Sequence, residues 1–312
     1  MAKSLDLAGR LVVAPAVRQA LAAGKPVVAL ESTLISHGLP YPENLDVATR
    51  AEAAVRESGA TPATVAIHDG QLLVGLDGAA LETLATAVPG SVLKAARPSL
   101  AAALARRGWA ATTVSATMIG AHAAGLRVFA TGGIGGVHRG AVGGSFDISS
   151  DLEELARTSM AVVCAGPKSI LDVPATLEYL ETRGVPVVAI GQATMPGFFA
   201  RTAGVAAPAS VEDVAAAADL ARVHLGLQLG SAILVCVPVP AADAVPDDVA
   251  LAVVGRAVAD AEHEGIAGPA LTPWLLARIG TLSDGASIRA NTSLIVNNAR
   301  VAGELAARLA SA

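Results

Sequence analysis

The chain has 312 residues, a formal net charge of −5 and a hydrophobic fraction of 53%. This length allows a sizeable core, and a weakly acidic chain without a run of Lys or Arg argues against nucleic acid and anionic membranes as partners. No apolar run reaches the roughly 20 residues of a membrane-spanning helix, and the N-terminus lacks the apolar stretch of a secretory signal. We therefore expect a cytoplasmic protein that acts on a small molecule.

The first half of the chain alternates short β-branched runs with helical patterns. We expect strands over residues 26–30, 63–68, 71–74 and 127–131. Asp69 and Gly70 form a two-residue turn between the second and third of these strands. Helices are expected over residues 44–58, 78–86, 99–107 and 116–124.

The second half continues the alternation and then becomes helical. Strands are expected over 161–165, 185–190 and 233–237, and helices over 150–157, 174–183 and 211–227. After a Pro- and Asp-rich linker, three more helices are expected over 249–264, 272–283 and 286–310. This order predicts an α/β fold in one domain, residues 1–312: a three-layer α/β/α sandwich around a largely parallel or mixed sheet, with a helical C-terminal cover.

Residue usage gives two further expectations. Charged residues make up only 16% of the chain, below the usual quarter, which favours a homo-oligomer with part of its surface buried. Cys164 and Cys236 lie in apolar runs and are expected to be reduced core residues.

Lysine is rare, and two lysines lie among apolar or small residues. Only Lys3, Lys25, Lys94 and Lys168 occur among the 22 basic residues. Lys168 follows the strand expected at 161–165, at the carboxyl end where open α/β sheets place their sites. Apolar surroundings favour the free amine, so Lys168 can be a Schiff-base nucleophile, which arginine cannot. The structural alternative is a lysine that reaches the surface or pairs with Asp172.

A carboxylate ends an earlier buried strand. Glu31 follows the strand expected at 26–30, where an acidic group is costly unless it is hydrogen-bonded or functional. His37 lies in the Gly- and Pro-rich loop after it. Glu31 is a candidate proton donor, and a structural capping role is the alternative.

Seven glycines between residues 130 and 144 follow another strand. Such glycines let backbone N–H groups approach an anion such as phosphate, with His138 and Arg139 nearby. The spacing fits neither the dinucleotide fingerprint nor the P-loop, and a flexible surface loop is the structural alternative.

An acidic and hydroxyl-bearing segment comes next. Asp147 and Asp151 bracket Ser149 and Ser150 at the start of a helix. Carboxylates and hydroxyls at such a bend suit Mg²⁺ or Mn²⁺. In the alternative interpretation Asp151 caps the helix and Asp147 is a turn residue.

Taken together, these segments closely resemble the pseudouridine-5′-phosphate glycosidase family, also called the indigoidine synthase A-like family. The resemblance includes ALESTLISHGLPYPENL, TTVSATMIGAHAAGLRVFATGGIGGVHRGA, FDISSDL and VVCAGPKSILD. It implies reversible cleavage of pseudouridine 5′-phosphate by water to uracil and ribose 5-phosphate. The bond broken joins two carbons, and an iminium between lysine and C1′ of the opened sugar would act as the electron sink. The resemblance also implies a homotrimer that uses Mn²⁺.

Residue roles are carried over from the family motifs. Lys168 corresponds to the nucleophile and Glu31 to the proton donor. Substrate contacts correspond to Lys94, Val114, Ser149, Ser150, Asp151 and Asn291, and the manganese ligand to Asp147, with waters completing the coordination. The chain departs from the family pattern at Pro167 and by one additional residue in the segment 141–146.

Two other functions fit the same residues. An aldolase acting on another sugar phosphate would keep the Schiff base on Lys168 but would not require uracil. A non-catalytic sugar-phosphate-binding protein would use the glycine-rich segment and leave Lys168 unmodified.

Overall fold

The computed structural model describes residues 7–141, 144, 146–266 and 271–311. Lys3 lies outside the described residues. So do positions 142, 143 and 145, which belong to the segment 141–146 with the additional residue. No described helix has both the length and the apolar composition needed to cross a membrane.

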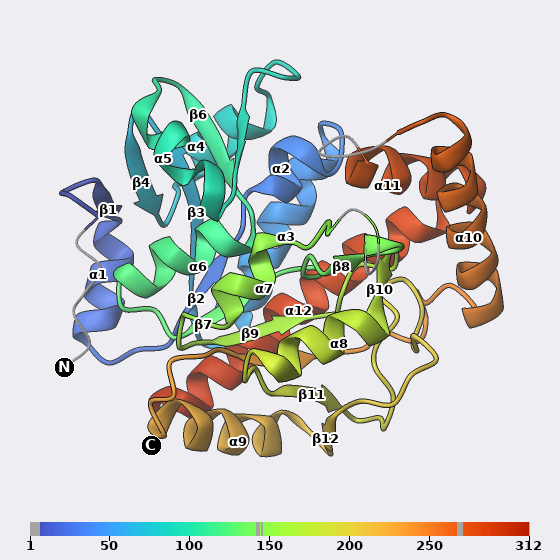
Figure 1. Ribbon diagram of the computed structural model, residues 1–312. Coiled ribbons are helices and arrows are strands. Elements are labelled where there is room, and N and C mark those ends of the chain that lie inside the picture. Colours follow the sequence, from blue (N-terminus) through green and yellow to red (C-terminus); the bar gives the residue numbers. More distant parts are fainter. Residues whose placement is uncertain (1–6, 142–143, 145, 267–270, 312) are drawn as a thin grey trace.

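The described strands build one large mixed sheet (Figure 1), whose main path is β1-β4-β3-β2-β7-β9-β13-β11-β12. Its members are β1 (Leu11–Val13), β2 (Val27–Leu30), β3 (Thr61–His68), β4 (Gln71–Val74), β5 (Leu93–Ala95), β6 (Trp109–Thr112), β7 (Val128–Ala130), β9 (Ala161–Cys164), β11 (Val187–Ile190), β12 (Ala209–Val211) and β13 (Ile233–Cys236). The strands from β3 through β2 to β12 run parallel, whereas β3 pairs antiparallel with β4 and β6. A separate antiparallel pair joins β8 (Val137–His138) and β10 (Leu171–Asp172).

Helices cover both faces of the sheet. One face packs against α3 (Glu43–Glu57), α9 (Val214–Gly226), α10 (Asp247–His263), α11 (Leu271–Leu282) and α12 (Ala286–Ala310). The other packs against α1 (Pro15–Ala22), α5 (Leu100–Ala105), α6 (Val114–Ala123), α7 (Ser150–Leu155) and α8 (Val173–Thr182). Two further helices, α2 (Thr33–His37) and α4 (Gly78–Ala85), form a smaller cluster beside β6. The predicted three-layer sandwich with its helical C-terminal cover is confirmed.

The central strands are buried on both faces because successive side chains alternate between two apolar layers. In β2, Val28 and Leu30 belong to the layer with α12, and Val27 and Ala29 belong to the layer with α6. The long helix α12 lies along the sheet and contacts α3, α9, β2, β7 and β9 (Figure 1). These contacts bring its polar residues close to the strand ends.

Several elements differ from the prediction. The helix expected from Val211 begins at Val214, because Asp213 caps it by accepting from Ala216 N and Val211 belongs to edge strand β12. Several short elements were not predicted, since most span too few residues to develop a periodic pattern: the strands β1, β5, β6, β8, β10 and β12 and the helices α1 and α2. Cys164 and Cys236 are buried and free, as predicted.

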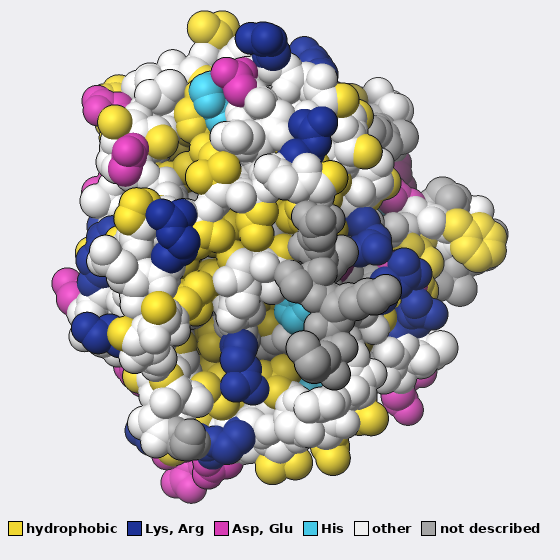
Figure 2. Space-filling model, turned by 90° about the vertical axis from the view of Figure 1, so that its left-hand side faces the viewer, with side chains coloured by type: hydrophobic (Ala, Val, Ile, Leu, Met, Phe, Trp, Pro, Cys, Tyr) yellow, Lys and Arg dark blue, Asp and Glu magenta, His cyan; other side chains and the backbone are white. Residues whose placement is uncertain are grey.

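The described surface carries both charge signs. On the face that Figure 2 presents, Lys and Arg side chains occur at several separate places among hydrophobic ones, and the acidic side chains lie mainly toward the rim of the view. This distribution agrees with the weak net charge of the sequence.

Candidate active site

Three neighbouring parallel strands end at the same edge of the sheet and supply the centre of the site. Glu31 follows β2, Thr131 follows β7, and Lys168 lies on the segment after β9. Parallel strands place their carboxyl ends together, so residues far apart in the chain meet here.

Two adjoining cavities lie at this edge and share Glu31, Thr33, Lys94 and Lys168. The first lobe, about 190 Å³, is also lined by Thr113, Val114, His138, Ser149, Ser150 and Asp151. The second lobe, about 90 Å³, is also lined by His37, Gly132, Phe198, Leu276, Asn291 and Ile295. All the predicted catalytic and substrate-binding residues therefore line one lobe or both.

Glu31 is nearly buried and fully hydrogen-bonded. Its side chain accepts from the Thr131 hydroxyl at Oε1 and from the Thr33 hydroxyl at Oε2. These bonds offset the cost of burying a carboxylate. The sequence did not identify either threonine as a partner, although Thr131 follows directly on the strand next to β2.

The segment that carries Lys168 is fixed through its backbone. Lys168 N donates to the Ile134 carbonyl at 3.1 Å, and Gly166 has φ +85°, a conformation that favours glycine. Asp172 does not hold the lysine, because its side chain accepts from Ala175 N and caps α8. The alternative of a Lys168–Asp172 pair is therefore wrong.

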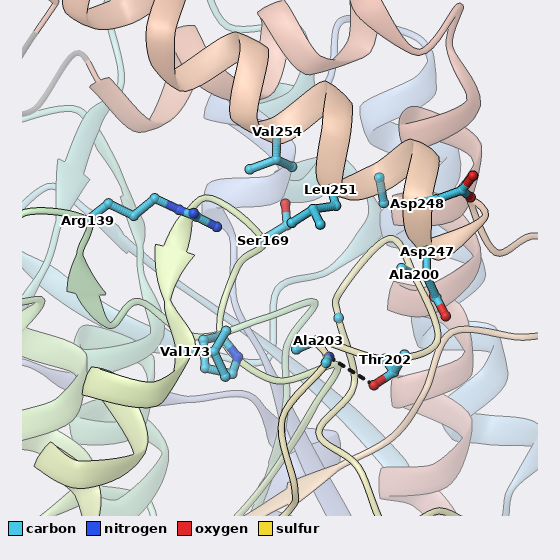
Figure 3. A pocket seen from close by; sticks show the side chains of 14 residues that line it. Arg139, Ser169, Val173, Ala200, Thr202, Ala203, Asp247, Asp248, Leu251 and Val254 are labelled. Atoms are coloured by element: carbon cyan, nitrogen blue, oxygen red, sulfur yellow. Dashed lines mark hydrogen bonds between the residues drawn. The ribbon is translucent and has the colours of Figure 1, made fainter.

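A larger cavity of about 270 Å³ lies beside the same segment (Figure 3). Pro167 and Ser169 line it, together with Arg139 and with Leu251 and Val254 of α10. Lys168 lines the two lobes instead. The lysine and its two neighbours therefore line different cavities. The larger one contains none of the residues assigned to catalysis, substrate or metal, but Arg139, expected near an anion, lines it and neither lobe.

Lys94 lies on β5 and is open to both lobes. Loss of hydration in the cavity, followed by repulsion from Lys168, lowers the pKa of Lys94 below its ordinary value. Glu31 and Asp151 act in the opposite direction. His37, in the second lobe, has a pKa lowered first by burial and then by the charge of Lys94. Loss of hydration is thus the first cause of both lowered pKa values, and the neighbouring lysine charge adds to it in each case.

Asp151 connects the first lobe to two backbone segments. Its Oδ1 accepts from Ser115 N and its Oδ2 from Gly135 N, both at 3.0 Å. Ser149 caps α7 by accepting from Asp151 N. Because both carboxylate oxygens are engaged, Asp151 holds the wall of the lobe together. The hydroxyls of Ser149 and Ser150 also line the lobe, and Ser150 Oγ lies 3.4 Å from Ser115 Oγ.

The glycine-rich segment is packed into the protein. A side chain on Gly135 would overlap Ser149 and Asp151, and Ile134 N donates to the Gly166 carbonyl. Val137 N donates to the Thr176 hydroxyl. The alternative of a flexible surface loop is therefore wrong for residues 131–138, and the N–H groups of residues 134, 135 and 137 bind protein acceptors instead of an anion.

Asp147 lies beside the first lobe without lining it. Its Oδ2 is 3.9 Å from Nδ1 of His138, which does line the lobe. The described residues contain no group of three or more His, Cys, Asp or Glu side chains placed to hold a metal. A single carboxylate fits a divalent ion that keeps most of its water ligands.

The comparisons with known proteins are consistent with this geometry. A family model described as indigoidine synthase A-like protein matches residues 16–308. A pseudouridine-5′-phosphate glycosidase of Paracoccus denitrificans (strain Pd 1222) is 52% identical over 96% of this chain and 99% of its own length. One of Solibacter usitatus (strain Ellin6076) is 53% identical over 96% and 99%.

Solved structures share the same architecture. The prealnumycin C-glycosynthase AlnA, in complex with ribulose 5-phosphate, superposes with a TM-score of 0.89 at 39% identity, covering 97% of this chain and 98% of AlnA. An indigoidine synthase A-like protein from Thermotoga maritima gives 0.83 at 34% identity, covering 92% and 94%.

Proposed function

The chain belongs to the indigoidine synthase A-like family, and we propose that it cleaves pseudouridine 5′-phosphate reversibly to uracil and ribose 5-phosphate. One observation carries the proposal: Lys168 and Glu31 stand where two lobes of different character meet. The names of the relatives in Paracoccus and Solibacter support the same substrate.

The two lobes suit the two halves of this substrate. Lys94, His138 and the hydroxyls of Ser149 and Ser150 offer positive charge and hydrogen bonds to a sugar phosphate. The second lobe offers apolar contact from Phe198 and the amide of Asn291 to a planar base. Val114, at the start of α6, also lines the first lobe. A substrate bound in this way would set its C1′–C5 bond between Lys168 and Glu31.

The reaction balances with these two residues and water. The Lys168 amine bonds to C1′ as the C1′–O4′ bond breaks, and O4′ takes a proton. Glu31 then protonates C5 of uracil, the electron pair of the C1′–C5 bond goes to that carbon, and the nitrogen lone pair forms the C1′=N iminium. Water adds to C1′, its proton restores Glu31, and the amine leaves as ribose 5-phosphate is released.

We also propose Mn²⁺ as the cofactor, with Asp147 as its protein ligand. When bound, such an ion would supply positive charge next to the phosphate lobe. Asp147 and His138 would hold the ion beside the wall of the first lobe. There the backbone bridge between Val137 of β8 and Ile148 keeps the two segments together. The homotrimer implied by the resemblance and the cytoplasmic location expected from the sequence stay predictions.

The direct test mixes the protein with uracil, ribose 5-phosphate and Mn²⁺ and follows pseudouridine 5′-phosphate by chromatography and mass spectrometry. Borohydride with ribose 5-phosphate alone should trap an adduct on Lys168, located by peptide mapping. An adduct without the C-nucleotide would point to an aldolase or to another carbon nucleophile. Binding of ribose 5-phosphate without any adduct would point to the non-catalytic binding protein.

A further inference from the structure

The orientation of Glu31 depends on a residue outside both lobes. Thr33 and Thr131 each donate to one oxygen of the carboxylate, and only Thr33 lines the lobes. Thr131 is 3% exposed and follows β7. Its hydroxyl can fix the direction of the Glu31 carboxylate only if the Thr131 peptide is itself fixed.

Asn298 of α12 holds the carbonyl side of that peptide, in addition to the backbone bonds from Thr131 N to the Val163 carbonyl and from Ala165 N to the Gly132 carbonyl. Its Nδ2 donates to the carbonyl oxygens of Thr131 at 2.9 Å and of Gly132 at 3.2 Å, and the residue is 1% exposed. Turning the amide over would set its oxygen against two carbonyl oxygens, so these two bonds determine its orientation. In the described part of the chain Oδ1 has no hydrogen-bond partner. A buried amide oxygen left unpaired is costly, which argues that the two carbonyl contacts account for an asparagine here.

The same helix also reaches the second lobe. Asn291 lines that lobe and precedes Asn298 by two helical turns, so the two amides share one side of α12. Asn291 contacts the lobe assigned to the base, and Asn298 holds the strand end that carries Thr131. One helix therefore aligns the base-binding lobe with the proton donor.

We propose that Asn298 and Thr131 are positioning residues for proton transfer by Glu31. Asn298 holds the carbonyl side of the Thr131 peptide, and the Thr131 hydroxyl fixes the carboxylate opposite C5 of the base. The inference rests on the proposed function, in which Glu31 exchanges a proton with that carbon. Neither residue lines either lobe, so formation of the Schiff base on Lys168 is independent of both.

The test compares Thr131→Val, Thr131→Ser and Asn298→Leu with the unaltered protein in the synthesis direction. Misplacing the carboxylate should lower kcat about ten- to a hundredfold in Thr131→Val and Asn298→Leu, with little change in KM. Thr131→Ser keeps the hydroxyl and should stay near the unaltered rate. Borohydride trapping of ribose 5-phosphate on Lys168 should proceed equally in all, and the isotope effect on kcat with uracil deuterated at C5 should rise in the two slow variants.

Asn297→Leu is the matched control, because the neighbouring Asn297 side chain bonds Arg300 at the surface. Equal losses of trapping and turnover, or an unchanged isotope effect, would mean that Asn298 and Thr131 act only on stability and would overturn the proposal. If Asn298→Leu does not fold, Asn298→Ser is measured in the same way, since it also removes the amide donor. If the unaltered protein forms no pseudouridine 5′-phosphate, the proposed function itself fails. If it does and Thr131→Val is as fast, only the positioning role fails.

Discussion

The Lys168 segment and the Glu31 segment leave nearby strands of one sheet, yet the protein holds them in opposite ways. Glu31 is fixed through its side chain, with a threonine hydroxyl on each oxygen. Lys168 is fixed through its backbone, by the Ile134 carbonyl and the turn at Gly166. Among the described residues, no side chain forms a hydrogen bond or an ion pair with its amine.

This difference suits the two chemical tasks proposed for Lys168 and Glu31. A nucleophile must move onto C1′ and then turn with the sugar as bonds form and break, so side-chain partners would have to be released each time. A proton donor must keep one direction relative to C5, so fixed partners help it. The site thus combines an amine on a segment fixed through its backbone with a carboxylate fixed through its side chain.

The largest effect is expected for Lys168→Arg. The substitution keeps the positive charge but removes a group that can deprotonate and attack a carbon, so turnover should fall by at least roughly a thousandfold. Borohydride should trap no ribose 5-phosphate adduct. Lys25→Arg, the same change on an exposed lysine, is the control. Turnover retained in Lys168→Arg would rule out the Schiff-base mechanism.

Glu31→Gln should separate the proton-transfer step from formation of the Schiff base on Lys168. It removes the acid but keeps the shape and the hydrogen-bonding capacity of the side chain, so turnover should fall about a hundred- to ten-thousandfold. Trapping of ribose 5-phosphate on Lys168 should continue. Quenched-flow measurement of the adduct alongside product formation checks both, and parallel loss of the two would place Glu31 in the lysine step instead.

Only part of this site could be predicted from the sequence. Glu31, Lys94 and Lys168 were identifiable because a charged residue among apolar neighbours is costly unless it is paired or functional. The parallel order of the strands then brings the residues at their carboxyl ends together. Thr131 and Asn298 lie in segments that resemble the family, but their contacts were not identifiable, because a threonine after a strand and an asparagine on a helix have many ordinary uses. Their roles depend on the order of the strands in the sheet and on how α12 packs against it. Local sequence patterns encode neither of these. The glycine-rich segment led to an expected phosphate cradle, whereas its glycines permit close packing against Ser149 and Phe198.

Metal removal is expected to have an intermediate effect. Chelation, or Asp147→Asn, should lower turnover roughly ten- to a hundredfold if Asp147 is the protein ligand of Mn²⁺. Electron paramagnetic resonance should show weaker Mn²⁺ binding in Asp147→Asn than in the exposed control Asp248→Asn. Unchanged binding would remove Asp147 from the metal site.

The lowered pKa of Lys94 predicts a pH dependence of binding. Because the pKa lies below the ordinary 10.5, the amine loses its proton and its charge at a lower pH than a free lysine does. The KM for ribose 5-phosphate should therefore rise roughly tenfold as the pH increases through that lowered value. Lys94→Arg stays charged and should flatten the profile. A profile identical in both proteins would mean that Lys94 does not bind the phosphate.

The smallest effect should tell the two lobes apart. Asn291→Leu removes one amide from the second lobe at nearly constant volume, and it should raise the KM for uracil about three- to tenfold while leaving the KM for ribose 5-phosphate unchanged. Ser150→Ala, in the first lobe, should do the reverse. Initial rates with each substrate varied in turn give both constants. If Asn291→Leu raised the KM of the sugar phosphate instead, the assignment of the base to the second lobe would have to be exchanged. Lys168 and Glu31 would still stand at the junction, but the carboxylate would then face the substrate from the side of the sugar.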